Sequence, residues 1–134
     1  EESCSIGFSM NILQSLDLEV IVAGGSMRRF WALEPFGATT FLSGVGSFNP
    51  QIEEDFFSFY KNNQLEEAKK IIKQTENPFH NVFMKIGWHA SMRYALKFMG
   101  YLNGNRNPFV TLSNSEIELI EEALHKVIIK DYSI

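Results

Sequence analysis

The sequence contains a single cysteine, Cys4, so no disulfide can form within it and no paired cysteines offer a zinc site. No apolar run approaches the roughly 18 residues that span a bilayer, and the start EESCSIGF lacks a basic segment ahead of an apolar core. Basic residues are also few: 12 stand against 16 acidic ones, which gives no basic footprint for nucleic acid or an anionic membrane. We therefore expect a soluble, cytoplasmic protein that acts on a small molecule, with no nucleic acid or membrane partner.

The three histidines form no recognisable catalytic or metal-binding pattern. His80, His89 and His125 are too scattered along predicted helices for a metal triad. No histidine is expected near the same face as Ser26 or Ser43, so a Ser-His-Asp arrangement is not supported. The sequence predicts neither a metal site nor a cofactor.

The most informative stretch, residues 18–50, predicts a strand, a glycine turn, a helix, a glycine and a second strand. Residues 18–23 form a nearly continuous apolar run rich in β-branched side chains, which is typical of a strand buried on both faces. The run stops at Gly24-Gly25, and Ser26 is placed to cap the helix that follows. This order of elements indicates one α/β repeat.

Pro35 and Gly37 end that helix, and residues 38–43 form a second apolar strand before a turn of small residues at 44–47. We expect the two strands to be parallel neighbours. Nothing after residue 50 reads as a convincing third strand, and a lone pair leaves exposed edges. Either further residues of the same protein or another chain must complete the sheet.

The rest of the sequence has helical periodicity. Helices are expected at residues 5–15, from Asn49 as N-cap and Pro50, from 65 up to Pro78, at 88–99, and from Ser113 onward. Pro78 is expected to break or restart its helix, and Gly100 to end the helix before it in the left-handed conformation. Ser113 and Glu116 form a capping-box pattern that opens the last helix.

The run GATTFLSGVGSFNP, residues 37–50, resembles the eighth strand and following turn of the dihydrodipicolinate synthase and N-acetylneuraminate lyase family, commonly GADGVISVxxNxxP. VIVAGG is similar to the family's seventh strand, and NNQLEEAKKI to its G-D-x-x-x-A-x-x-L helix start. The tail resembles its closing pattern of a helix ending in Gly, then R-x-P, then L-S-x-x-E. The order and spacing of these motifs carry the resemblance over nearly the whole chain.

The resemblance implies an α/β fold, a TIM (β/α)₈ barrel with a C-terminal helical extension. Residues 1–63 would then be the C-terminal part of the barrel, comprising the end of unit 6 and units 7 and 8. Residues 64–134 would be the helical extension. The same resemblance implies that the rest of the barrel is a partner of this chain, and that the protein is a homo-oligomer, either a tetramer or a dimer.

Membership would also imply a lyase, an aldolase or a dehydratase, in which a lysine forms a Schiff base with pyruvate or another 2-oxo acid. The family's lysine precedes motifs such as K-D-S-S or K-E-S, so it is expected just before Glu1 and no catalytic residue is expected within the chain. One alternative is 4-hydroxy-tetrahydrodipicolinate synthase activity in lysine biosynthesis. Another is a non-catalytic barrel used for ligand sensing or assembly.

Active-site groups of such barrels follow the carboxyl ends of the strands. The predicted substrate-binding residues are Gly24, Gly25, Ser26, Arg28, Leu42, Ser43 and Gly44. Arg28 has bidentate geometry for a carboxylate, or else is a surface residue on the first turn of its helix. Synthases of the family carry Gly-Asp-Asp and the neuraminate lyases Gly-x-Asp-Glu, whereas this chain has GGSM at 24–27. That difference disfavours sialic acid and leaves the amino-group chemistry of the synthases unsupported.

Overall fold

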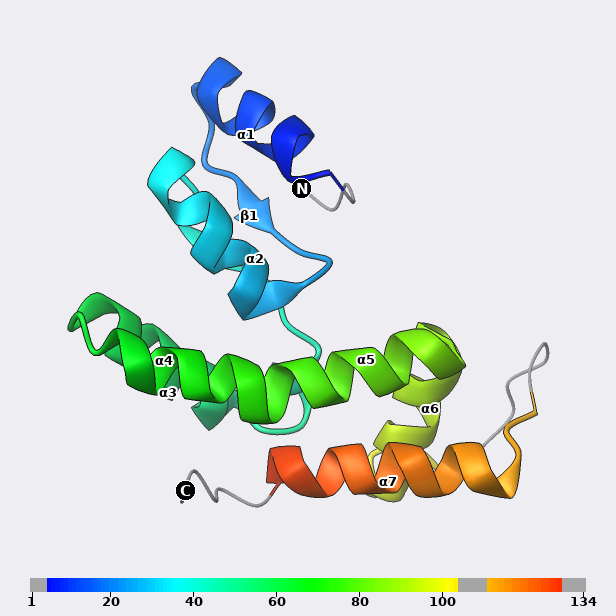
Figure 1. Ribbon diagram of the computed structural model, residues 1–134. Coiled ribbons are helices and arrows are strands. Elements are labelled where there is room, and N and C mark those ends of the chain that lie inside the picture. Colours follow the sequence, from blue (N-terminus) through cyan, green and yellow to red (C-terminus); the bar gives the residue numbers. More distant parts are fainter. Residues whose placement is uncertain (1–4, 104–110, 129–134) are drawn as a thin grey trace.

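The computed structural model describes residues 5–103 and 111–128 (Figure 1). Along the chain the elements are α1 (Ile6–Ser15), β1 (Ile21–Val22), α2 (Ser26–Leu33), η1 (Glu34–Phe36), β2 (Thr40–Phe41), η2 (Val45–Ser47), α3 (Pro50–Lys61), α4 (Leu65–Ile71), the π-helical η3 (Ile72–Glu76), α5 (Asn77–Ile86), α6 (Trp88–Phe98) and α7 (Asn114–Ile128). Cys4 and the predicted R-x-P motif at residues 106–108 lie outside the described residues.

β1 and β2 form a parallel pair connected through α2, as the sequence predicts. Ile21 pairs with Thr40 and Val22 with Phe41. One further backbone hydrogen bond, 2.9 Å from the Leu42 N–H to the Val22 carbonyl oxygen, extends the pairing toward the carboxyl ends of the strands. The two chain segments that follow the strands therefore leave the sheet at the same edge.

The strands are shorter than the predicted ranges 18–23 and 38–43, with two paired residues each. Within the described residues each strand has one neighbour, so the flanking apolar residues have no further ladder to join. Burial on both faces of the first strand is also wrong for this chain: Val22 is fully buried, but Ile21 is 45% exposed. α2 covers the face to which Val22 belongs, and the opposite face is open to solvent in the described part of the chain.

The two ends of α2 are capped in different ways. Gly25, with a φ of 143°, is its N-cap, and no side chain of the cap residue contributes a hydrogen bond. The prediction that Ser26 caps this helix is therefore wrong, because a carboxylate from a distant helix takes that role, as described below. Gly37 follows the helical segment with a φ of 107°, so its predicted position as the stop is confirmed.

α4, η3 and α5 form one continuous helical run (Figure 1). Pro78 lies in the first turn of α5, where a missing N–H costs little. It restarts the α-helix after the wide π-helical turn, in which the Asn77 N–H bonds to the Ile72 carbonyl oxygen. The proline thus ends the π-helical segment without breaking the continuous helical run of α4, η3 and α5.

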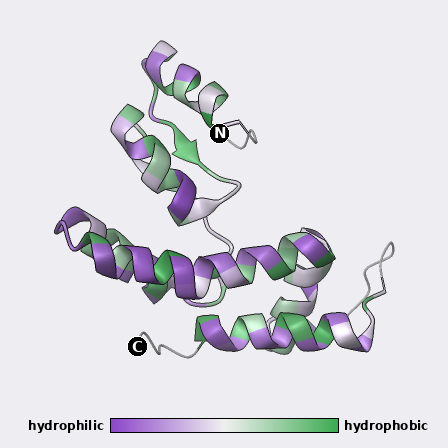
Figure 2. Cartoon of the chain, in the orientation of Figure 1, coloured by the Kyte–Doolittle hydropathy of each residue, from purple (hydrophilic) through white to green (hydrophobic). Residues whose placement is uncertain are grey.

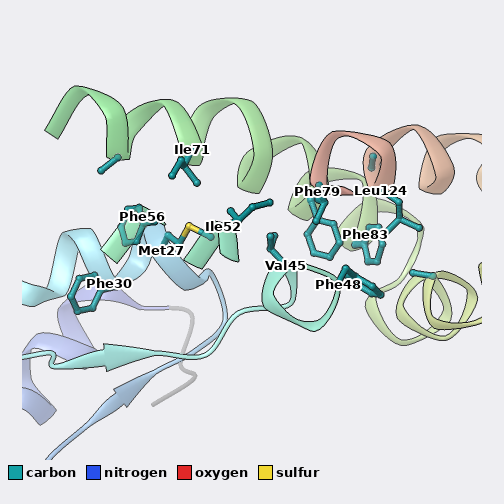
Figure 3. Close-up of a cluster of buried hydrophobic side chains, with 14 of the residues drawn as sticks. Met27, Phe30, Val45, Phe48, Ile52, Phe56, Ile71, Phe79, Phe83 and Leu124 are labelled. Carbon is teal, nitrogen blue, oxygen red and sulfur yellow. The ribbon is translucent and has the colours of Figure 1, made fainter. Parts of the chain in front are cut away.

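The core lies between this long helical run and the sheet, with α7 closing it at the other end (Figure 3). Phe30 and Phe56 make one buried aromatic group, and Phe79 and Phe83 make another with ring centroids 4.0 Å apart. Leu124 of α7 joins the second group. These aromatic side chains therefore belong to the hydrophobic core.

Two helices begin at their predicted positions, but only one of them is capped as the sequence predicts. The Ser113 hydroxyl oxygen accepts from the Glu116 N–H at 3.3 Å, and the Ser113 N–H donates to the Glu116 carboxylate at 2.8 Å, so the capping box is confirmed. α3 begins at Pro50 with Asn49 as N-cap residue, but the Asn49 side chain donates to the Val127 carbonyl oxygen at 2.9 Å instead of capping. None of the helices in the described residues is long and apolar enough to cross a membrane.

Candidate functional site

A pocket of about 750 Å³ lies at the edge of the sheet where both strands end. Its lining residues are Ala23, Gly24, Gly25, Ser26, Leu42, Ser43, Gly44, Ser47, His80, Met84, Trp88, His89 and Met92. Six of the seven predicted substrate-binding residues are among them, and Arg28 is not. The loops after β1 and β2, far apart in the sequence, therefore meet around one cavity, as parallel pairing of their strands requires.

The wall opposite the loops comes from α5 and α6, which contribute two histidines to the pocket. The prediction that no histidine lies near the face of Ser26 and Ser43 is wrong, because the helical run folds back across the strand ends. His80 and Met84 stand four residues apart on α5, and Trp88 is at the start of α6. That spacing was visible in the sequence, but it is equally typical of a core stripe.

The loop after β1 has an unusual backbone. Gly24 and Gly25 have φ values of 63° and 143°, and Ser26 has a φ of 49°. Glycine adopts left-handed conformations at little cost, so Gly24 and Gly25 fit these positions. Ser26 requires a compensating interaction. Its hydroxyl provides one, since it is hydrogen-bonded to the carboxylate of Glu76.

Glu76 anchors this loop from the end of η3. Its Oε1 accepts from the Met27 N–H at 2.8 Å and its Oε2 from the Arg28 N–H at 3.0 Å, so the carboxylate caps α2 across 49 residues of sequence. The side chain is almost completely buried. Burial raises the pKa of Glu76 to about 7, against the lowering effect of the bound N–H groups. No local pattern in the sequence signals this cap.

A second carboxylate, from Glu53 of α3, lies under the loop after β2. Burial raises the pKa of Glu53, and hydrogen bonding from the Ser43 hydroxyl and the Gly46 N–H acts against that rise, while Oε1 of Glu53 is buried without a hydrogen-bond partner among the described residues. The Ser43 Oγ also accepts from the Val45 N–H at 3.1 Å. This hydroxyl is thus engaged within the loop, and a Cβ at Gly46 would overlap the Glu53 carboxylate.

Gly44 is the point at which the loop and α6 come closest. A Cβ there would lie 2.9 Å from Cζ2 of Trp88, and nearer still to Cη2. Its φ of −73° is available to any residue, so the requirement for glycine is steric. The indole of Trp88 thereby forms a wall of the pocket directly against the backbone of the loop.

Arg28 lies behind the pocket wall and not in it. Its Nη1 donates to Oδ1 of Asn77 at 3.1 Å, and its Nη2 is 2.8 Å from Nδ1 of His80. Burial and the nearby guanidinium both lower the pKa of His80. A guanidinium has no acceptor, so the neutral imidazole accepts at Nδ1 and carries its proton on Nε2.

The sequence matches the dihydrodipicolinate synthetase family over residues 5–127. The protein belongs to this family. The strand, turn and helix motifs indicated a resemblance to this family, and that resemblance is therefore confirmed. No curated protein sequence matches the chain.

A solved structure with a similar fold is the 4-hydroxy-tetrahydrodipicolinate synthase from the thermoacidophilic methanotroph Methylacidiphilum fumariolicum SolV. The TM-score is 0.75 at 17% sequence identity, and the match covers 95% of this chain and 42% of the synthase. The family chain described here thus spans less than half of that relative's length and has the fold of part of a TIM barrel.

Proposed function

We propose that this chain contributes the pocket of a lyase, an aldolase or a dehydratase, that uses a lysine Schiff base with pyruvate or another 2-oxo acid. The observation that carries the proposal is the convergence of both strand-end loops on one cavity. Family membership supports the class of chemistry. In that mechanism the protonated imine withdraws electrons, so the adjacent carbon loses a proton and can attack an acceptor or expel a leaving group.

The proposal includes the arrangement of units. Residues 1–63 would supply the end of unit 6 and units 7 and 8 of the barrel, and residues 64–134 the helical extension. Exposed apolar side chains in and next to the two strands support it: Leu18 is 70% exposed, Leu42 63% and Ile21 45%. Figure 2 shows that β1 is hydrophobic. The rest of the barrel would cover this surface, because exposed apolar area of this kind marks an interface.

The loop after β1 also bears on the substrate. The lining residues of the pocket in the described part of the chain include no carboxylate, and the Ser26 hydroxyl is bound to Glu76. The acidic residues that the lyases of the family use for sialic acid are absent from this loop. The acidic residues that the synthases use for their amino-group chemistry are absent as well. A simple 2-oxo acid therefore fits this loop better than either, while the acceptor or leaving group stays open.

Borohydride trapping tests the proposal. The full-length protein is incubated with pyruvate and sodium borohydride, and its intact mass and peptide map are compared with those of protein treated with borohydride alone. We expect a pyruvate-dependent reduced adduct on a lysine immediately before Glu1. Absence of the adduct, in protein that is folded by circular dichroism, would instead indicate the non-catalytic barrel used for sensing or assembly.

A second assay separates the lyase from the synthase alternative. Aspartate semialdehyde is added with pyruvate, and formation of the cyclic condensation product is followed by absorbance. We expect pyruvate trapping without this product. Product formation at a rate comparable with pyruvate turnover would favour the synthase.

A further inference from the structure

The loop after β1 has a conformation that its own residues do not maintain. Gly24, Gly25 and Ser26 all have a positive φ, and all three line the pocket. For serine this conformation is unfavourable, because its Cβ crowds the backbone. Strain of this kind persists only where the surrounding structure enforces it, and it is found most often at functional sites. The loop therefore needs a restraint from elsewhere in the molecule.

The carboxylate of Glu76 supplies that restraint. It accepts hydrogen bonds from three consecutive residues, namely from the Ser26 hydroxyl, from the Met27 N–H at 2.8 Å and from the Arg28 N–H at 3.0 Å. An ionised carboxylate can accept all of these bonds at once. One planar group thus fixes the backbone at the point where the loop becomes α2.

The place of Glu76 in its helix is also unusual. Glu76 is the last residue of the π-helical segment η3. The extra residue of a π-helical turn changes which side chains face a neighbouring element, and such turns occur frequently at functional sites. Here η3 packs against α2 and brings Glu76 to the N-terminus of that helix. A device of the helical run therefore aims this carboxylate at the pocket loop.

This restraint costs more than an ordinary helix cap. Serine, threonine or asparagine at the N-cap position would satisfy the same N–H groups without burying a charge. Glu76 is almost completely buried, and burial raises its pKa to about 7. The positive charge of Arg28, whose guanidinium is held by Asn77 and His80, offsets only part of that cost. A buried ionisable group with a specific charge partner beside a cleft is typical of a functional site.

We propose that Glu76 is the positioning residue of this loop and holds Gly24, Gly25 and Ser26 in the conformation that binds the 2-oxo acid. The identity of the ligand rests on the proposed function. Glu76 does not line the pocket, so it acts through the loop and not on the substrate. Every contact that defines its role lies within residues 24–80, and the role does not depend on which residues complete the pocket.

Pyruvate trapping by variants of the full-length protein tests the proposal, at about pH 8, above the pKa of Glu76. Glu76→Gln keeps the size of the side chain but removes its charge. We expect the half-saturating pyruvate concentration to rise about tenfold in this variant, while saturating pyruvate still traps all of the folded protein. A merely structural role would lower the amount of folded protein and leave that concentration unchanged. Glu118→Gln, at an exposed position on α7, is the matched control and should behave as the wild type.

Two substitutions at Ser26 separate loop positioning from a direct contact of the hydroxyl with the ligand. Ser26→Ala and Ser26→Gly both remove the hydroxyl, but only glycine adopts a φ of 49° without strain. The half-saturating pyruvate concentration should rise about tenfold in Ser26→Ala and at most about threefold in Ser26→Gly. Adding Ser26→Gly to Glu76→Gln should recover at least about threefold of the lost affinity.

Hydrogen exchange in the peptide that contains residues 24–28 gives a readout that needs no Schiff base. Without a ligand, this peptide should exchange faster in Glu76→Gln than in the wild type, because the anchored N–H groups open more often. Pyruvate should slow the exchange in the wild type. Glu76→Gln should need about ten times more pyruvate for the same slowing.

Three results would each overturn the proposal. The first is a wild-type half-saturating pyruvate concentration in folded Glu76→Gln. The second is an equal rise in Ser26→Ala and Ser26→Gly. The third is loop exchange in the wild type that does not respond to saturating pyruvate. A failure of trapping, together with slowed exchange that Glu76→Gln weakens, would reject the Schiff-base function and retain Glu76 as the residue that positions a 2-oxo acid-binding loop.

Discussion

The buried carboxylate of Glu76 should make the stability of this protein depend on pH in a specific direction. Burial raises the pKa of Glu76 from 4.5 to about 7, so the folded state holds its proton more tightly than the unfolded state does. Between these two values unfolding releases a proton, and stability falls as pH rises. The contribution is fully present below about pH 4.5 and is lost once the pH has passed about 7.

The magnitude follows from the same two values. A rise from 4.5 to about 7 corresponds to about 3 kcal/mol of unfolding free energy. Glu76→Gln removes the titrating group while keeping one acceptor for the N–H groups of α2. Urea unfolding of wild type and Glu76→Gln at half-unit steps from pH 5 to 8 should show the wild type losing most of that amount relative to the variant. The loss should be concentrated below about pH 7.5.

Other titrating groups are common to both proteins and cancel in the difference. Burial and Arg28 lower the pKa of His80, so its contribution to the stability of the protein changes with pH in the opposite direction. That contribution is lost as the pH falls below 6.5, the ordinary pKa of histidine. Glu118→Gln, at an exposed position on α7, controls for the loss of one negative charge. Parallel pH dependences for wild type and Glu76→Gln would refute the assignment of a raised pKa to the buried cap.

Four further substitutions, one of them a control, are tested by urea unfolding. Gly44→Ala should cost about 1 to 3 kcal/mol because the added methyl overlaps Trp88, whereas Gly7→Ala, which has room in α1, should be neutral or stabilising; equal effects would contradict the close approach. Phe83→Ala should cost about 3 to 5 kcal/mol because its ring is fully buried, and a loss below 1 kcal/mol would show that the site collapses. Ser113→Ala should cost about 1 kcal/mol by removing the N-cap of α7, and an unchanged midpoint would show that the cap is dispensable.

Several features could be predicted because they depend on neighbours in the sequence. The apolar run before Gly24 and the glycine at position 37 predicted the parallel pair and the end of α2, and Ser113 with Glu116 predicted a helix start. The strand ends in turn predicted most of the pocket-lining residues on the barrel side. In each case the residue and its partner are a few positions apart, or the parallel topology brings them together without further information.

Sequence alone established the family motifs, the order of the elements and the edge of the sheet at which the pocket lies. Only the tertiary structure decided that Glu76 caps α2, that His80 forms part of the pocket and that Arg28 stands behind it. These contacts join residues about 50 positions apart, through helices that fold back across the strand ends. Local periodicity shows which face of a helix is apolar, but the polar side chain that meets a distant loop depends on how whole elements pack, and no short-range pattern encodes that.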